Sequence, residues 1–269
     1  MGFPFLTISL LSRAAVAAFL FVTTCGRVSA DGQSTASPSP APQLPPTYLQ
    51  VQEEISPDYA SESGSSTQFN VSGQMLISGN RYLLRLKLPI VTSAPGRAVT
   101  GAGDLALTDL RFFDTAATHY VAGITARLPT SQNTSLGSGK YSIGPVFGYQ
   151  FQSGRWRVGF YNQNYFSIIG TSSRPAVGRS KIEPIVSISL PYGWTVGFST
   201  MSFTYDWVLN KWTEVPIGGL VTKSFGRFGK LGAIGNVLPL QATLEMEQNL
   251  SSVKFTPGWT TRISLRWVF

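Results

Sequence analysis

The sequence predicts an all-β protein: an antiparallel transmembrane β-barrel of about twelve strands, preceded by a signal peptide and a disordered Pro/Ser-rich leader. Three observations predict this fold. Apolar and polar residues alternate with a period of two, each alternating segment runs for about 10 to 14 residues, and short links alternate with long ones. Strands of soluble proteins average about 5–6 residues, whereas strands that cross a membrane need about 9–11. Segment length therefore favours a membrane barrel over the alternative, a secreted all-β domain.

The first 30 residues have the features of a secretory signal peptide. Arg13 precedes an apolar run at residues 14–22, and small residues at the end of this stretch predict cleavage after Ala30. The apolar run is much shorter than the ~20 residues that a spanning helix needs. Because the single cysteine is Cys25, cleavage would leave a chain without cysteine, which suits an oxidising compartment.

Residues 31–46 form a tract rich in Ser, Pro, Ala and Gln. Such a composition cannot bury an apolar core, so we expect a disordered leader here. The barrel is expected to take up the remainder of the chain, residues 47–269.

Twelve segments of the barrel region carry the alternating pattern. The expected strands cover residues 47–56, 67–77, 81–91, 103–113, 118–129, 140–152, 155–166, 180–190, 193–204, 211–226, 237–248 and 258–269. Short links follow the second, fourth, sixth and eighth segments, and longer links lie between them, as in barrels with short periplasmic turns and long outer loops. The link at residues 227–236 is long where this scheme requires a short one, so a count of ten or fourteen strands stays open.

The last segment gives the clearest pattern and ends on an aromatic residue. Apolar or aromatic side chains at every second position, among them Ile263, Leu265 and Trp267, alternate with polar ones up to Phe269. An aromatic residue at the end of an amphipathic strand resembles the assembly signal of outer-membrane barrels. We therefore expect the barrel assembly machinery to recognise the last strand through Trp267 and Phe269.

The composition excludes several classes of function. Charged residues make up 13% of the chain, against roughly 25% in soluble domains. A single Cys25 and a single His119 exclude cysteine clusters and most histidine-based zinc sites, so we expect no metal and no cofactor. Lys and Arg total 21 against 13 Asp and Glu, but they are dispersed along the strands without the basic cluster that nucleic-acid binding requires.

The charged residues of the strands lie mostly on the faces opposite the apolar stripes. A lipid-facing Arg or Lys costs about 2–4 kcal/mol at the bilayer midplane, which makes the barrel lumen their cheaper location. The expected lumen-lining residues are Arg85, Lys87, Arg127, Arg155, Arg157, Lys181, Glu183, Glu245, Glu247, Arg262 and Arg266. Their excess of basic groups predicts a weak preference for anions. The open alternative is that Arg–Glu pairs simply fill a narrow barrel.

The sequence also shows whether the barrel has the residues that an enzyme would need. A lipid hydrolase built on a barrel needs a base to activate a serine, and only His119 is present, without a distinctive serine motif around it. We therefore expect an interfacial, non-catalytic His119 and no catalytic residue. Glu245 and Glu247 share a strand face, where a cation-facing or arginine-paired role is simpler than acid–base chemistry.

Several stretches resemble the outer-membrane transporters grouped as the "MetA-pathway of phenol degradation" family. The matching stretches include Arg-Leu-Pro-Thr at residues 127–130, Leu-Gly-Ser-Gly-Lys-Tyr-Ser-Ile-Gly-Pro at 136–145, and Trp-Thr-Glu-Val-Pro-Ile-Gly-Gly at 212–219. The likeness runs over about residues 67–269. It implies a barrel and a role in passing small, often hydrophobic, molecules, while leaving the cargo undefined.

The sequence thus predicts an integral protein of the bacterial outer membrane, in contact with its lipid, that lets small hydrophobic or anionic molecules pass. A second class of function is a plugged structural or adhesive barrel without transport. A third, a barrel lipid hydrolase, depends on His119 alone.

Overall fold

The structure is a computed structural model that describes residues 46–57, 65–77, 81–93, 100–114, 118–133, 135–225, 239–251 and 258–269. The expected signal peptide and the leader up to residue 45 lie outside the described residues, as does the whole of the long link at 227–236. Within the described ranges, no helix is long and apolar enough to cross a membrane.

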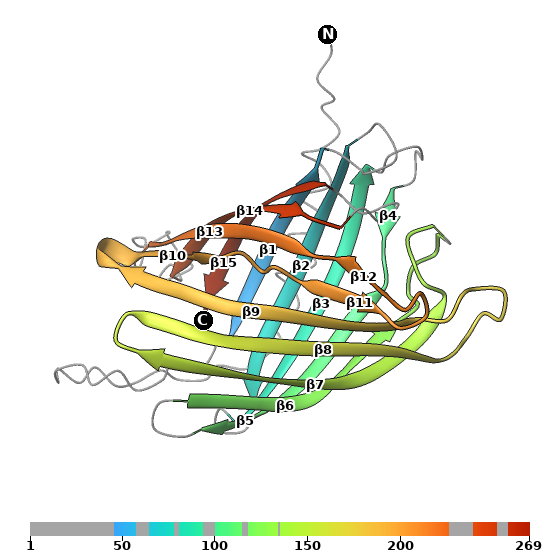
Figure 1. Ribbon diagram of the computed structural model, residues 1–269, viewed down its shortest axis with the longest axis horizontal. Coiled ribbons are helices and arrows are strands. Elements are labelled where there is room, and N and C mark those ends of the chain that lie inside the picture. The colour runs from blue at the N-terminus through green and yellow to red at the C-terminus, as the bar shows by residue number, and fades with distance from the viewer. Residues whose placement is uncertain are drawn as a thin grey trace, which may run out of the picture. The chain divides into compact units, whose positions relative to one another are not determined.

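The described chain is almost entirely β-strand (Figure 1). The strands are β1 (Tyr48–Ser56), β2 (Ser66–Ile77), β3 (Tyr82–Ser93), β4 (Gly101–Ala102), β5 (Leu105–Asp114), β6 (Thr118–Leu128), β7 (Lys140–Ser153), β8 (Trp156–Gly170), β9 (Gly178–Leu190), β10 (Trp194–Phe198), β11 (Phe203–Asp206), β12 (Lys211–Glu214), β13 (Pro216–Phe225), β14 (Leu240–Asn249) and β15 (Trp259–Val268). A short 3-10 turn, η1 (Pro191–Gly193), joins β9 to β10.

The strands close into a barrel with antiparallel neighbours throughout. The first strand, β1, pairs with the last, β15, so that Tyr48 lies opposite Val268, and the blue and red strands meet in Figure 1. On the far side β10 pairs with both β9 and β13, which completes the ring. Three wall strands are interrupted: β4 continues into β5, β10 into β11, and β12 into β13. The fifteen labelled strands therefore make a barrel of twelve wall strands. The expected antiparallel barrel of twelve strands is confirmed.

Apolar side chains cover the outside of the barrel, whereas the inside is largely polar. Along β7, Tyr141, Ile143 and Phe147 are exposed on the outer face, while Ser142 and Val146 between them are buried. Fully buried side chains in other strands are again often polar, such as Thr125 on β6 and Asn70 on β2. This inversion of a soluble core is the arrangement expected where lipid is the surrounding solvent.

One small apolar cluster interrupts the polar interior. Leu83, Leu110, Phe112 and Val146 are buried against one another on the inward faces of three strands, β3, β5 and β7. They lie toward the end of the barrel with the short turns, because Leu83 and Phe112 are each close to the turn that ends their strand. Leu83, Leu110 and Phe112 fill part of the interior at that end.

Candidate functional site

Two cavities occupy the interior of the barrel. The loop-side cavity, of about 630 Å³, is lined by inward side chains of β2, β3, β6, β8 and β9 and by loop residues such as Leu136 and Arg174. The turn-side cavity, of about 750 Å³, extends from there toward the chain ends, where Tyr48 and Val268 line it. Glu183 on β9 lines both cavities, so they meet at its side chain.

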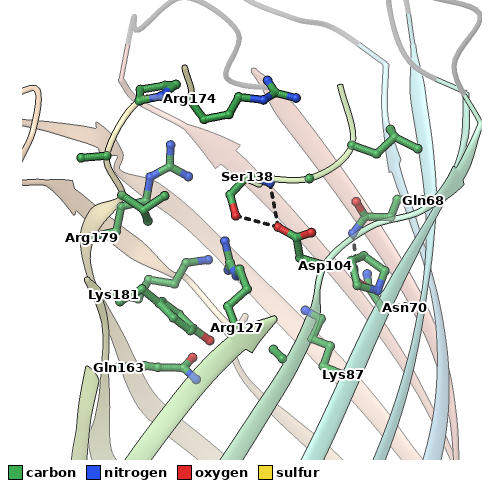
Figure 2. A pocket seen from close by; sticks show the side chains of 18 of the residues that line it. Gln68, Asn70, Lys87, Asp104, Arg127, Ser138, Gln163, Arg174, Arg179 and Lys181 are labelled. Atoms are coloured by element: carbon green, nitrogen blue, oxygen red, sulfur yellow. Dashed lines mark hydrogen bonds between the residues drawn. The ribbon is translucent and has the colours of Figure 1, made fainter. Parts of the chain in front are cut away.

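Basic side chains dominate the loop-side cavity. Its lining includes Lys87, Arg127, Arg174, Arg179 and Lys181 against Asp104 and Glu183. Figure 2 shows Lys87, Arg127 and Lys181 extending into the same space from three strands, β3, β6 and β9. Alternation explains their direction, because each lies an even number of positions from other inward residues of its strand.

The acidic group nearest the loops is already engaged. Asp104 Oδ2 accepts hydrogen bonds from the backbone N–H of Ser138 at 2.7 Å and from its hydroxyl at 2.8 Å, and Asp104 Oδ1 accepts one from the Ser131 N–H at 3.4 Å. These bonds hold the loop that starts after β6 against the wall (Figure 2). The carboxylate is a loop anchor, and among the described residues it forms no ion pair with Lys87, Arg127 or Lys181. Asp104 thus caps this loop.

Arg127 is held in position by an aromatic ring. Its guanidinium lies over the ring of Tyr165, 4.5 Å from the centroid, and Tyr165 is buried in turn. The Thr125 hydroxyl, itself fully buried, lies 3.4 Å from the Tyr165 hydroxyl and accepts a 2.9 Å hydrogen bond from Gln163 Nε2. The stacking leaves the edges of the guanidinium open for hydrogen bonds to a ligand.

Two further arginines in the turn-side cavity are supported in a similar way. Arg85 donates to Gln74 Oε1 at 3.1 and 2.9 Å and lies 5.7 Å from the ring centroid of Tyr161. Arg266 donates to Gln50 Oε1 at 2.8 and 2.6 Å and lies 4.4 Å from the ring centroid of Tyr48. Each positive charge is thus fixed on the wall by a neutral glutamine and a tyrosine, and neither arginine forms an ion pair with a described residue.

The carboxylates of β14, those of Glu245 and Glu247, form ion pairs inside the barrel. Arg262 Nη1 lies 2.6 Å from Glu247 Oε2 and 3.6 Å from Glu245 Oε2, and Arg262 Nε lies 2.9 Å from Glu54 Oε2. The same glutamates hold the break between β10 and β11: Glu247 accepts the Met201 N–H at 2.7 Å, and Glu245 accepts the Thr200 hydroxyl at 2.9 Å. Three acids and one arginine therefore form a structural cluster.

Comparison with solved structures adds a fold relationship. The barrel matches the crystal structure of an outer membrane channel from Pseudomonas putida F1, with a TM-score of 0.54, 14% sequence identity, and coverage of 87% of this chain and 100% of that one. The chain shares the fold of a bacterial outer membrane channel.

A barrel that is an enzyme is less similar than this channel. Outer membrane phospholipase A from Escherichia coli gives a TM-score of 0.43 at 11% identity, covering 84% of this chain and 94% of that one. No family model and no curated protein matches the sequence. The resemblance to the phenol-degradation family therefore stays a prediction.

Most residues expected in the lumen of this channel-like barrel line one of the two cavities. The loop-side cavity takes Lys87, Arg127, Lys181 and Glu183, and the turn-side cavity takes Arg85, Arg157, Glu183, Glu245 and Arg266. Glu247 and Arg262 belong to the internal network. Arg155 differs: it is exposed in the tight turn between β7 and β8, where Gly154 adopts a φ of +55°, and therefore projects from the end of the barrel.

The sequence interpretation missed Glu54, Arg174 and Arg179. Glu54 and Arg179 each lie an even number of positions from inward residues of their own strands, so the alternating pattern could have identified them. Arg174 lies in a loop, where no alternating pattern indicates the direction of a side chain. His119 was expected at the membrane interface, but it is buried on the inward face of β6 and lines the turn-side cavity. Its alternation with the outward Tyr120 explains the difference.

Proposed function

We propose that this chain is an integral outer-membrane channel that passes small solutes and prefers anions. The observation that carries the proposal is the loop-side cavity, where cations from three strands converge while Asp104 is engaged by the loop. A pore lined by one sign of charge concentrates ions of the opposite sign and repels those of the same sign.

The exterior of the barrel supports placement in a membrane. Aromatic residues are exposed toward the turn end of the outer wall, among them Tyr82, Phe113 and Trp156, as in the interfacial girdles of such barrels. The start of β1 and the end of β15 meet at the side of the short turns, which we assign to the periplasm. The signal peptide, with cleavage after Ala30, and recognition of Trp267 and Phe269 by the assembly machinery belong to the same proposal.

The character of the lining favours polar anions over hydrophobic cargo. Around the loop-side cavity, charged and amide side chains such as Lys87, Lys181 and Gln163 outnumber apolar ones such as Leu136 and Val177. Desolvating a hydrophobic molecule gains little against such a wall, whereas a carboxylate or phosphate gains charged hydrogen bonds. The hydrophobic molecules implied by the family resemblance are therefore the less favoured cargo.

The test is electrical. Refolded protein comprising residues 31–269, shown to be folded by its heat-modifiable migration, is placed in a planar bilayer under a KCl gradient. We expect discrete conductance steps and a reversal potential of the sign that chloride preference gives. Replacing Lys87 and Lys181 together by Gln should shift that potential toward zero. Arg155→Gln, in an exposed turn, is the matched control and should leave it unchanged; cation selectivity in the unaltered protein refutes the anion preference.

A plugged barrel is the second candidate, because two features narrow the interior. The cluster of Leu83, Leu110 and Phe112 fills part of the turn end, and the inward break around Met201 is fastened to Glu247. Absence of any current from folded protein would favour this candidate over the channel.

A further inference from the structure

We propose, on the basis of the channel function above, that Lys87, Arg127 and Lys181 form a saturable binding site for an oxyanion with two negative charges. A dicarboxylate and a phosphate monoester present the same chemistry to such a site. The inference goes beyond a general preference for anions, because it predicts that a doubly charged solute binds where chloride merely passes.

The charges around the site leave a surplus of about two. Among the described residues, no ion pair involves Lys87, Arg127 or Lys181, whereas the neighbouring Arg179 is 3.1 Å from Asp206 Oδ2. Lys87 lies close enough to Lys181 and to Glu54 for their charges to interact, but Glu54 is itself paired with Arg262 at 2.9 Å. Three cations against Glu183 at the floor of the cavity leave two positive charges. Since like charges held in one cavity repel each other, a dianion compensates this surplus better than a monoanion does.

The three cations also offer different geometries of contact. Arg127, fixed over the buried ring of Tyr165, presents a planar fork that suits two oxygens of one carboxylate or phosphate group. Lys87 and Lys181 are compact ammonium groups on flexible stems, which adapt to the remaining oxygens. Because the arginine is held before the ligand arrives, less conformational entropy is lost on binding.

A packed loop lies over the site. The Asp104–Ser138 bonds hold the loop in place (Figure 2), and Leu136, Gly137 and Ser138 of this loop line the cavity. A Cβ atom at Gly137 would lie only 2.5 Å from Asp104 Oδ1, so this contact requires glycine. With a volume of about 630 Å³, the cavity accommodates a small organic dianion.

The experiment measures block of chloride current by added anions. Full-length protein is expressed, purified from outer membranes and studied in planar bilayers with succinate, glycerol phosphate or acetate added on the loop side. We expect saturable block by the dianions at a concentration at least tenfold below that for acetate, since one additional charged contact changes affinity by about tenfold. Block by succinate alone identifies a dicarboxylate site, and block by glycerol phosphate alone identifies a phosphate site. Equal block by acetate and the dianions overturns the proposal.

Variants and a direct binding measurement distinguish loss of the binding site from loss of the fold and from absence of a channel. Changing Lys87, Arg127 and Lys181 together to Gln should abolish the difference between dianions and acetate, whereas Arg155→Gln should preserve it. If the triple variant does not fold, Lys87→Gln alone should still raise the half-blocking succinate concentration several-fold. Calorimetric titration of the detergent-solubilised protein with succinate measures binding independently of current. If succinate binds but the protein does not conduct, the channel function is rejected and the binding site is supported. If the protein conducts but shows neither selective block nor binding, the binding site is rejected.

Discussion

At the residue scale, Arg262 is the side chain on which the interior most depends. It is mostly buried, with 16% of its side chain exposed, and it contacts Glu54, Glu245 and Glu247. Without it, three carboxylates would face one another in a space with little water. Two of them also fasten the break between β10 and β11, so loss of the arginine would act on the backbone as well.

We predict that Arg262→Met destabilises the barrel by about 3–5 kcal/mol, the range for removing one partner of a buried ion pair. The measurement is the temperature at which the folded, fast-migrating form disappears on SDS gels. Arg266→Met is the control, since Arg266 donates to the neutral Gln50 and leaves no carboxylate unpaired. Equal melting temperatures for the two variants would show that the network carries little of the stability.

At the element scale, close approach of strands depends on individual glycines. A Cβ atom at Gly123 on β6 would collide with the backbone carbonyl of Asp109 on β5, whereas one at Gly73 on β2 would meet nothing within 4 Å. The two positions lie within strands of the same barrel and differ in local space.

Gly123→Val should therefore disrupt the pairing of β5 with β6 and reduce the yield of folded protein to a small fraction. Gly73→Val, the matched control, should fold nearly as well as the unaltered chain, because valine suits strands. The fraction of heat-modifiable protein after refolding measures both. Similar losses in the two variants would contradict the role assigned to the contact at Gly123.

The terminal strand β15 closes the ring, and its last residue extends that closure. The Phe269 N–H donates to the Thr47 carbonyl at 2.9 Å, while the Phe269 side chain is 46% exposed. The backbone contact needs no aromatic ring. The ring is thus free to be recognised during assembly.

We expect Phe269→Asp to lower the amount of barrel inserted in cells several-fold and to leave the refolded, purified protein almost as heat-stable as before. Comparing outer-membrane abundance with melting of the refolded variant separates these effects. Thr260→Ser, inside β15, controls for expression. Normal abundance of the Phe269 variant would remove the role proposed for the terminus.

At the scale of the whole molecule, selectivity should depend on ionic strength. The Debye length falls from about 10 Å at 0.1 M salt to about 3 Å at 1 M, so distant wall charges stop acting on a passing ion. We predict that the anion-to-cation permeability ratio declines toward one between these concentrations at a fixed gradient. A ratio that does not change would mean that permeation is governed by a local steric constriction instead.

The strands were predictable because alternation is local. The expected segment at 258–269 agrees with β15, and that at 140–152 agrees with β7 to within a residue, since each strand separates a lipid face from a polar face along its own length. Two interruptions were not foreseen. The breaks at residues 199–202 and at Val215 divide wall strands in which the apolar and polar pattern continues.

The sequence by itself determined the class of fold and which face most side chains occupy, because these follow from a period of two and from the cost of polar groups in lipid. It predicted about twelve strands, and the closed ring fixed the number. Only the tertiary structure decided which inward residues meet. Glu54 and Arg262 are 208 residues apart, and Lys87, Arg127 and Lys181 come from three separate strands. Whether a residue stands at an odd or an even position of its strand decides which face its side chain occupies. Its position along the barrel axis and its partners across the lumen depend on the closure and stagger of the whole barrel.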